Sequence, residues 1–200
     1  SEFLNNVRKA TKNREFTICV VSGGFAIGAF VSFLTSSSGV ANSVFGLGAE
    51  TFGYYFGGTV SFILLGTLVS NYFVRRAGID TLIITGGILQ GMGGSSMLVF
   101  VLLGSTEPLT IFVPMGLFAF GFSIFYPLTT SRALSPFPEM AGTASSLIGF
   151  AQNLMGASAS GLVALLFDGS AFPMALIIFI GGIMPVFIYL PISNYWRSNQ

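Results

Sequence analysis

The stretch Pro136-Phe-Pro-Glu-Met-Ala-Gly-Thr-Ala-Ser-Ser-Leu-Ile-Gly-Phe-Ala-Gln-Asn-Leu-Met-Gly156 joins a short polar loop to a long uncharged helix. At about 100° per residue, its small and polar side chains recur on one stripe of that helix. The stripe consists of Gly142, Ser146, Gly149, Asn153, Gly156 and Ser160, and the opposite side carries Leu147, Leu154, Met155 and Leu162. The bulky side suits lipid, whereas the small side suits another helix backbone or a water-filled cavity. We therefore predict a membrane helix in which Gly142, Ser146, Gly149, Gly156 and Ser160 are helix-packing positions.

The whole chain has the composition of a membrane protein, with 52% hydrophobic and 8% charged residues among 200. A membrane-spanning helix needs roughly 20 predominantly apolar residues. Six uncharged gaps of sufficient length separate the charged residues, at 16–49, 51–74, 81–106, 108–131, 140–167 and 169–196. We therefore predict an all-α, six-helix transmembrane bundle over 16–192, with spans near 16–35, 51–74, 81–103, 109–131, 141–167 and 173–192.

The segments between and beside these spans are short. Residues 1–15 are expected to form a cytoplasmic linker or a short surface helix, and 193–200 a cytoplasmic tail. The serine-rich run from Ser36 to Gly48 is expected to end the first helix and to form an outer loop.

The basic residues predict the orientation of the bundle. All eight fall on one side of the predicted spans, namely Arg8, Lys9, Lys12, Arg14, Arg75, Arg76, Arg132 and Arg197. The loops on the other side hold only Glu50, Glu107 and Asp168. Because basic loops stay on the cytoplasmic side, the pattern predicts a multi-pass protein of the inner membrane with both termini in the cytoplasm.

The residues needed for several classes of function are missing. The chain has no histidine and a single cysteine, Cys19, which lies inside the first predicted span. This composition excludes imidazole-based catalytic triads, most metal sites and an internal disulfide. No two carboxylates lie close together within the spans, and no phosphate-binding loop is present. We expect no enzyme, no cofactor, no metal and, at a net charge of +1, no nucleic-acid partner.

Polar and aromatic groups at membrane depth are the candidate binding residues. Gln152 and Asn153 lie near the middle of the fifth span, where each amide has to face another helix or a hydrated cavity. For Asn153, a hydrogen bond between helices and a cavity-lining role both remain open. Phe118, Phe122 and Phe125 share a helix face at i, i+4 and i+7, and could form an aromatic wall or simply pack in the core.

Glycines are concentrated in the first and third spans. Gly24 and Gly28 form a G-x-x-x-G spacing, which permits close helix contact. The third span contains Gly86, Gly87, Gly91, Gly93 and Gly94. Tight packing is the favoured interpretation, and flexibility needed for movement is the alternative.

Three segments resemble a known family. These are Glu50-Thr-Phe-Gly-Tyr-Tyr-Phe56, Phe73-Val-Arg-Arg-Ala-Gly78 and Phe137-Pro-Glu-Met-Ala-Gly-Thr-Ala-Ser-Ser-Leu147. Together they resemble the second half of the Bcr/CflA drug-resistance transporters of the major facilitator superfamily. The likeness runs over nearly the whole chain, and its most specific part is Ala141-Gly-Thr-Ala-Ser-Ser146. Arg75, Arg76 and Gly78 resemble the cytoplasmic loop motif that this superfamily repeats in each half.

The resemblance implies a twelve-helix transporter in which two six-helix bundles rock around a central site and export drug-like molecules in exchange for protons. The first, second, fourth and fifth spans would line the cavity, with Phe118, Phe122, Phe125, Gln152 and Asn153 as candidates for substrate contact. The proton-titratable carboxylate would lie in an N-terminal six-helix half that these residues do not include. Two other hypotheses are a self-contained six-helix membrane protein and an inactive truncated fragment.

Overall fold

The computed structural model describes residues 2–197, and their side chains from residue 5 to residue 191. All regular elements in this part of the chain are helical, which confirms the predicted fold class. They are α1 (Glu2–Lys12), α2 (Arg14–Phe45), α3 (Ala49–Ala77), α4 (Ile79–Leu102), α5 (Leu109–Leu134), a 3₁₀ turn (Pro138–Met140), α6 (Ala141–Leu166) and α7 (Phe172–Arg197). Six of these helices, α2 to α7, are long and apolar enough to cross a membrane.

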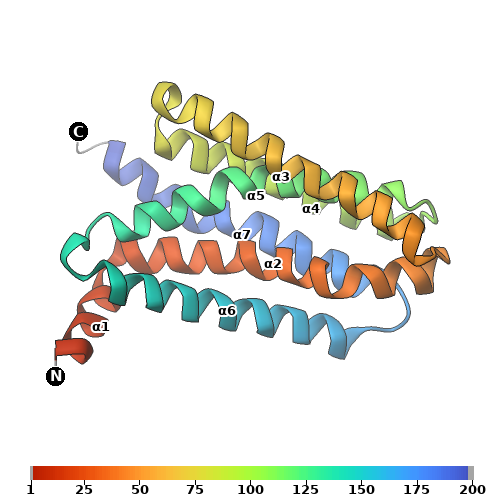
Figure 1. Ribbon diagram of the computed structural model, residues 1–200, viewed down its shortest axis with the longest axis horizontal. Coiled ribbons are helices and arrows are strands. Elements are labelled where there is room, and N and C mark those ends of the chain that lie inside the picture. The colour runs from red at the N-terminus through yellow and green to blue at the C-terminus, as the bar shows by residue number, and fades with distance from the viewer. Residues whose placement is uncertain (1, 198–200) are drawn as a thin grey trace.

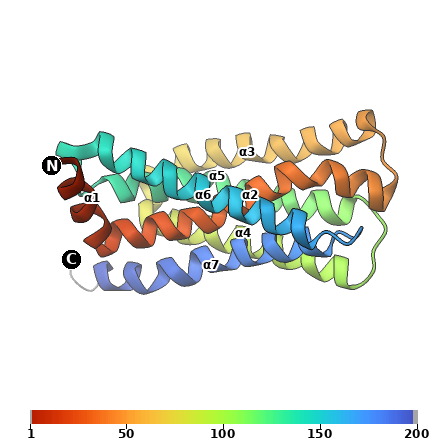
Figure 2. The same cartoon turned by 90° about the horizontal axis from the view of Figure 1, so that it is seen from below.

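The six long helices run side by side along the long axis of the molecule, and α1 packs against one end of α2 and α6 (Figure 1). Helix α4 packs between α5 and α7, while α2 contacts α5, α6 and α7. Helices α3 and α6 lie on opposite sides of this core, α3 against α5 and α6 against α2 (Figure 1). In a view turned by 90°, α3 and α7 lie on opposite sides of the bundle (Figure 2).

Helices α3 and α6 are far more exposed than the others. Only 11% of the apolar window in α3 and 22% of that in α6 is buried, compared with 67% in α5. Each of the two flanking helices therefore keeps a wide face that no other helix of this bundle covers.

The prediction that the first helix ends near Ser36 is wrong, because α2 continues to Phe45. Two serines of this run donate their hydroxyl groups to carbonyls one turn earlier: Ser36 donates to Ser32, and Ser43 donates to Gly39 at 2.8 Å. Such bonds let a serine-rich run remain helical in apolar surroundings. The helix ends at Gly46, whose φ of +65° is a left-handed conformation that favours glycine.

The glycines of α4 lie at close helix contacts, as the packing interpretation predicts. A Cβ on Gly93 would lie 2.6 Å from the backbone nitrogen of Phe118 in α5, and one on Gly94 would lie 2.8 Å from the carbonyl oxygen of Ile178 in α7. In α2, Gly24 faces Met155 and Gly28 faces Ala159 of α6. Small residues therefore set the distances between the central helices.

A tight turn joins α6 to α7. Asp168 accepts hydrogen bonds from the hydroxyl and the backbone N–H of Ser170, at 2.6 and 2.9 Å. These bonds stabilise the carboxylate and lower the pKa of Asp168 below its ordinary value. Gly169, with φ at +87°, supplies the left-handed residue that the turn requires.

Candidate functional site

The charged residues lie at the two ends of the bundle. One end carries α1, the start of α2, the turn between α3 and α4, and the end of α5, and with them every described basic side chain. The opposite end carries Glu50, Glu107 and Asp168. Between the two ends the helices offer only apolar, aromatic and uncharged polar groups.

A network of charged groups ties four helices together at the basic end. Arg132 Nε at the end of α5 lies 3.0 Å from Glu15 Oε1 in α2, and Arg132 Nη2 lies 3.7 Å from Asp80 Oδ2 in α4. The hydroxyl of Tyr189 in α7 donates to Asp80 Oδ1 at 2.6 Å. The sequence placed Arg132 at this end, but its partners are too distant along the chain for pattern reasoning to find them.

The predicted loop motif forms the tight connection between α3 and α4. Gly78 is the only residue between the two helices, and its φ of +81° favours glycine. Arg75 and Arg76 end α3 with exposed side chains, and the Arg76 guanidinium lies 4.7 Å from the centre of the Tyr72 ring.

The three candidate phenylalanines of α5 do not have the same surroundings. Phe118 and Phe125 are fully buried, and both lie against glycines of α4: the Phe118 backbone meets Gly93, and the Phe125 ring meets Gly87. Both pack in the core, and Phe122, at 8% exposure, is also largely buried. Substrate contact by any of the three rings remains a prediction.

Phe122 is the middle ring of a stack that joins α2 to α5. Its ring centroid lies 4.7 Å from that of Phe30 and 5.0 Å from that of Tyr126, with interplanar angles of 10° and 19°. The Tyr126 hydroxyl donates to Gln152 Oε1 in α6 at 2.8 Å. Gln152 is only 3% exposed, and its Nε2 lies 2.7 Å from the place that a Cβ on Gly23 would occupy.

This aromatic stack and amide connect the three helices α2, α5 and α6. Sequence analysis found Gln152 from its depth in the membrane, but it missed Tyr126 as the hydrogen-bond partner and Phe30 as the third ring. Both depend on how α2, α5 and α6 approach one another. We call Phe30, Phe122, Tyr126 and Gln152 the aromatic-amide cluster.

Asn153 is exposed and forms its hydrogen bond within its own helix, because Nδ2 donates to the carbonyl of Gly149 at 2.7 Å. The structure therefore gives no support to a bond from Asn153 to another helix of this bundle. Its side chain lies on the uncovered face of α6, so the cavity-lining interpretation remains.

Only two of the five predicted packing positions of α6 contact another helix of this bundle. Gly156 lies against Val31, whose nearest atom is 3.5 Å from the place that a Cβ on Gly156 would occupy, and Ser160 shares a hydrogen bond of 2.6 Å with Thr35. Gly142 and Gly149 face open space, and Ser146 is exposed and bonds the carbonyl of Gly142. The covered side of α6 is rotated from the small stripe, toward Ala144, Ile148, Gln152 and Val163.

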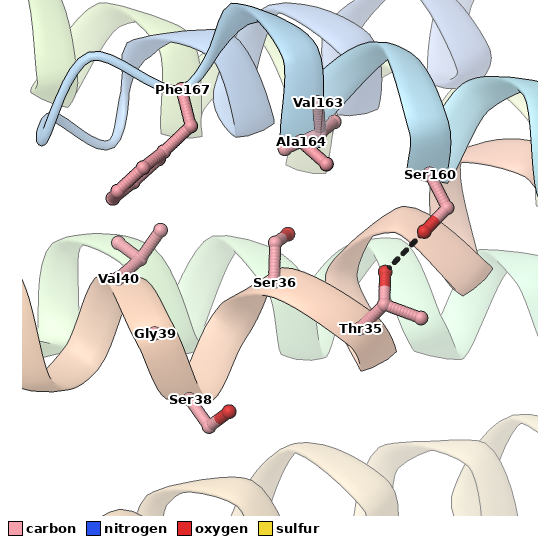
Figure 3. A pocket seen from close by; sticks show the side chains of 9 residues that line it. All are labelled: Thr35, Ser36, Ser38, Gly39, Val40, Ser160, Val163, Ala164 and Phe167. Carbon is pink, nitrogen blue, oxygen red and sulfur yellow. Dashed lines mark hydrogen bonds between the residues drawn. The ribbon is translucent and has the colours of Figure 1, made fainter.

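A pocket of about 380 Å³ opens between α2 and α6 toward the end that lacks basic residues. The hydrogen bond between Thr35 and Ser160 closes one side of it, and Phe167 extends toward Val40 on the other (Figure 3). No titratable side chain lines the pocket. Ser160 of the small stripe lines this pocket, which is suited to uncharged groups.

Comparison with known proteins finds two curated proteins to which the chain is similar. No family model matches the chain. Over 85 residues, or 42% of its length, the chain is 36% identical to Multidrug resistance protein D of Escherichia coli (strain K12), covering 22% of that protein. Over 170 residues, or 82% of its length, it is 28% identical to the Bicyclomycin resistance protein homolog of Haemophilus influenzae (strain ATCC 51907 / DSM 11121 / KW20 / Rd), covering 41% of that protein. The chain is thus similar to two bacterial drug-resistance proteins.

These similarities confirm the resemblance to the Bcr/CflA transporters of the major facilitator superfamily. Together with the six helices that are long and apolar enough to cross a membrane, they indicate a multi-pass membrane protein. The chain spans less than half the length of either relative.

Proposed function

We propose that the chain is the C-terminal six-helix bundle of a proton-coupled exporter of drug-like molecules that works by alternating access. The observation that carries the proposal is the uncharged aromatic-amide cluster, which connects α2 and α5 to the flanking helix α6, in a chain similar to drug-resistance proteins. In this proposal Phe122, Gln152 and Asn153 contribute to the wall of the substrate pathway, and Phe118 and Phe125 hold α5 against α4.

The proton-coupling group and the second wall of the pathway belong, in this proposal, to an N-terminal six-helix half. All described carboxylates lie near the ends of the bundle, which supports placing the group that exchanges protons elsewhere. The basic end faces the cytoplasm with both termini, as the distribution of arginine and lysine favours. The turn with Arg75, Arg76 and Gly78 then lies on the cytoplasmic side, where the two halves rock.

Export by the full-length protein tests this function. Everted membrane vesicles that contain the protein should accumulate uncharged antibiotics from a panel that includes bicyclomycin when the vesicle interior is acidified. A protonophore should abolish the accumulation. Accumulation of no member of the panel, or accumulation unaffected by the protonophore, would refute proton-coupled drug export.

The Asn153→Leu substitution distinguishes pathway lining from helix packing. Since Asn153 bonds only the carbonyl of Gly149 in its own helix, leucine should leave membrane abundance near that of the wild type. Drug resistance should fall by about three- to tenfold, which corresponds to the loss of roughly one net hydrogen bond to the substrate. Minimum inhibitory concentrations and immunoblots of the membrane fraction measure the two effects.

Phe187→Leu is the matched control, because Phe187 is 66% exposed on α7 and is expected to face lipid. Phe187→Leu should change neither membrane abundance nor drug resistance. A loss of abundance in Asn153→Leu, with resistance falling only in proportion, would show that Asn153 serves helix packing instead.

A further inference from the structure

We propose that the aromatic-amide cluster is a specificity subsite for uncharged, planar molecules that carry a hydrogen-bond acceptor at one edge. The inference rests on the proposed export function and specifies its substrate class. It follows from three properties of the cluster: the free faces of the stack, the unused donor of Gln152 and the absence of a counter-charge.

The middle ring of the stack is buried, and the two outer rings keep part of their surface exposed. Phe122 is 8% exposed and stacks with both Phe30 and Tyr126, whereas these two rings are only partly buried. Aromatic rings favour offset stacking with centroids 4.5 to 7 Å apart. A flat ligand can extend the stack on an outer ring without displacing any of the three side chains.

The carbonyl group of the Gln152 amide forms a hydrogen bond, whereas its NH₂ group forms none within the described residues. Its Oε1 accepts from Tyr126, which fixes the orientation of the side chain, and Nε2 has no hydrogen bond to any residue that the structure describes. A donor held at membrane depth without an acceptor is unfavourable. Glycine at position 23 makes room for this amide, because a Cβ there would lie only 2.7 Å from Nε2. A carbonyl or ring nitrogen of a ligand would satisfy the free donor.

The charges around the cluster select against ions. The helices that form it carry no charged residue between Glu15 and Phe45 in α2, between Leu109 and Ser131 in α5, or anywhere in α6. Arg132, six residues and about 9 Å of helix rise beyond Tyr126, is positive and is held by Glu15 and Asp80. A cationic ligand would lose its hydration here without gaining a carboxylate.

Two dyes that share a ring system test the inference. Nile red is neutral and carries a carbonyl group, whereas Nile blue has a cationic nitrogen in its place. Binding of each dye to the full-length protein in lipid nanodiscs would be measured by fluorescence titration, with empty nanodiscs as the blank. We expect Nile red to bind at least about tenfold more tightly than Nile blue, and Gln152→Leu to weaken Nile red binding about tenfold.

Gln90→Leu is the matched control, because Gln90 is also fully buried at membrane depth, but it lies in α4 against α5 and α7. It should leave Nile red binding unchanged. Tyr126→Phe keeps the ring but releases the Gln152 amide, and it should weaken Nile red binding two- to fivefold, an estimate of roughly half a hydrogen bond or more. This variant provides the test if Gln152→Leu unfolds at a lower temperature than the wild type.

The outcomes separate the subsite from the export function. Tighter binding of Nile blue, no binding of Nile red above empty nanodiscs, or equal losses in the Gln152 and Gln90 variants would overturn the subsite. Vesicle export that persists in any of those cases would leave the export function standing. The expected dye preference in a protein that exports nothing would support the subsite and refute the export function.

Discussion

Replacing Gly93 with valine is expected to prevent the bundle from accumulating in the membrane. The new Cβ would lie 2.6 Å from the Phe118 nitrogen, 2.7 Å from the Pro114 oxygen and 2.9 Å from the Phe118 Cα. All three are backbone atoms, so no rotamer change can relieve the clash, and α4 has to move away from α5. Overpacking of a well-packed core costs about 1–3 kcal/mol and occasionally more, and we expect the upper end of that range.

Gly57→Val is the control for this prediction, because Gly57 is also a helix-interior glycine in a predicted span, but a Cβ added there would have no neighbouring atom within 4 Å. Thermal unfolding in detergent and immunoblots of membranes compare the two variants. Gly93→Val should lower the unfolding temperature and the abundance strongly, and Gly57→Val should lower neither to a comparable degree. Equal behaviour of the two variants would show that α4 and α5 do not meet at Gly93.

Replacing Arg132 with glutamine is expected to have the second large effect. Arg132 is the cation between Glu15 and Asp80, and its loss leaves two carboxylates at one end of the bundle without their positive partner. The ion-pair side chains are only 23–25% exposed, so water compensates the loss incompletely. We expect a decrease of about 2–3 kcal/mol in the free energy of unfolding, since hydrogen bonds to charged groups contribute about 1.5–3 kcal/mol.

The pH dependence gives this prediction a second readout. In Arg132→Gln the unpaired carboxylates repel each other when ionised, so acidification that neutralises them should recover part of the lost stability. The control is Arg76→Gln, because Arg76 is exposed and contacts the Tyr72 ring, a contact that contributes about 0.5–1 kcal/mol at such sites. If Arg132→Gln were no less stable than Arg76→Gln at neutral pH, the network would not hold the four helices together.

The sequence predicted the six-helix fold because the requirement for a long apolar stretch is strong and local. Each gap between charged residues holds one long helix, and charge alone separated the gaps. The end of α2 was predicted wrongly because serine is typical of loops in water, whereas Ser36 and Ser43 bond the carbonyls of their own helix. In a membrane helix, serine is weak evidence for a loop.

The site was only partly predictable, because a periodic pattern shows that a helix has two different faces but not which neighbour covers each face. The small stripe of α6 was found, yet the helix turns Gln152 and Gly156 toward α2 and leaves Gly142 and Gly149 uncovered. Phe118, Phe122 and Phe125 share one face of α5, and only the folded arrangement shows that all three are buried within the bundle. Contacts such as Tyr126 with Gln152 join distant segments, and they required the folded arrangement.

The central claim is that the uncovered face of α6 lines a water-filled pathway while α7 faces lipid. The most direct test places a single cysteine at Asn153 or at Phe187 in the full-length protein and measures labelling by a water-soluble maleimide, with the buried native Cys19 as the unreactive background. We predict rapid labelling of Asn153→Cys, slowed by a transported drug, and negligible labelling of Phe187→Cys. Rapid labelling at Phe187 with none at Asn153 would contradict the claim.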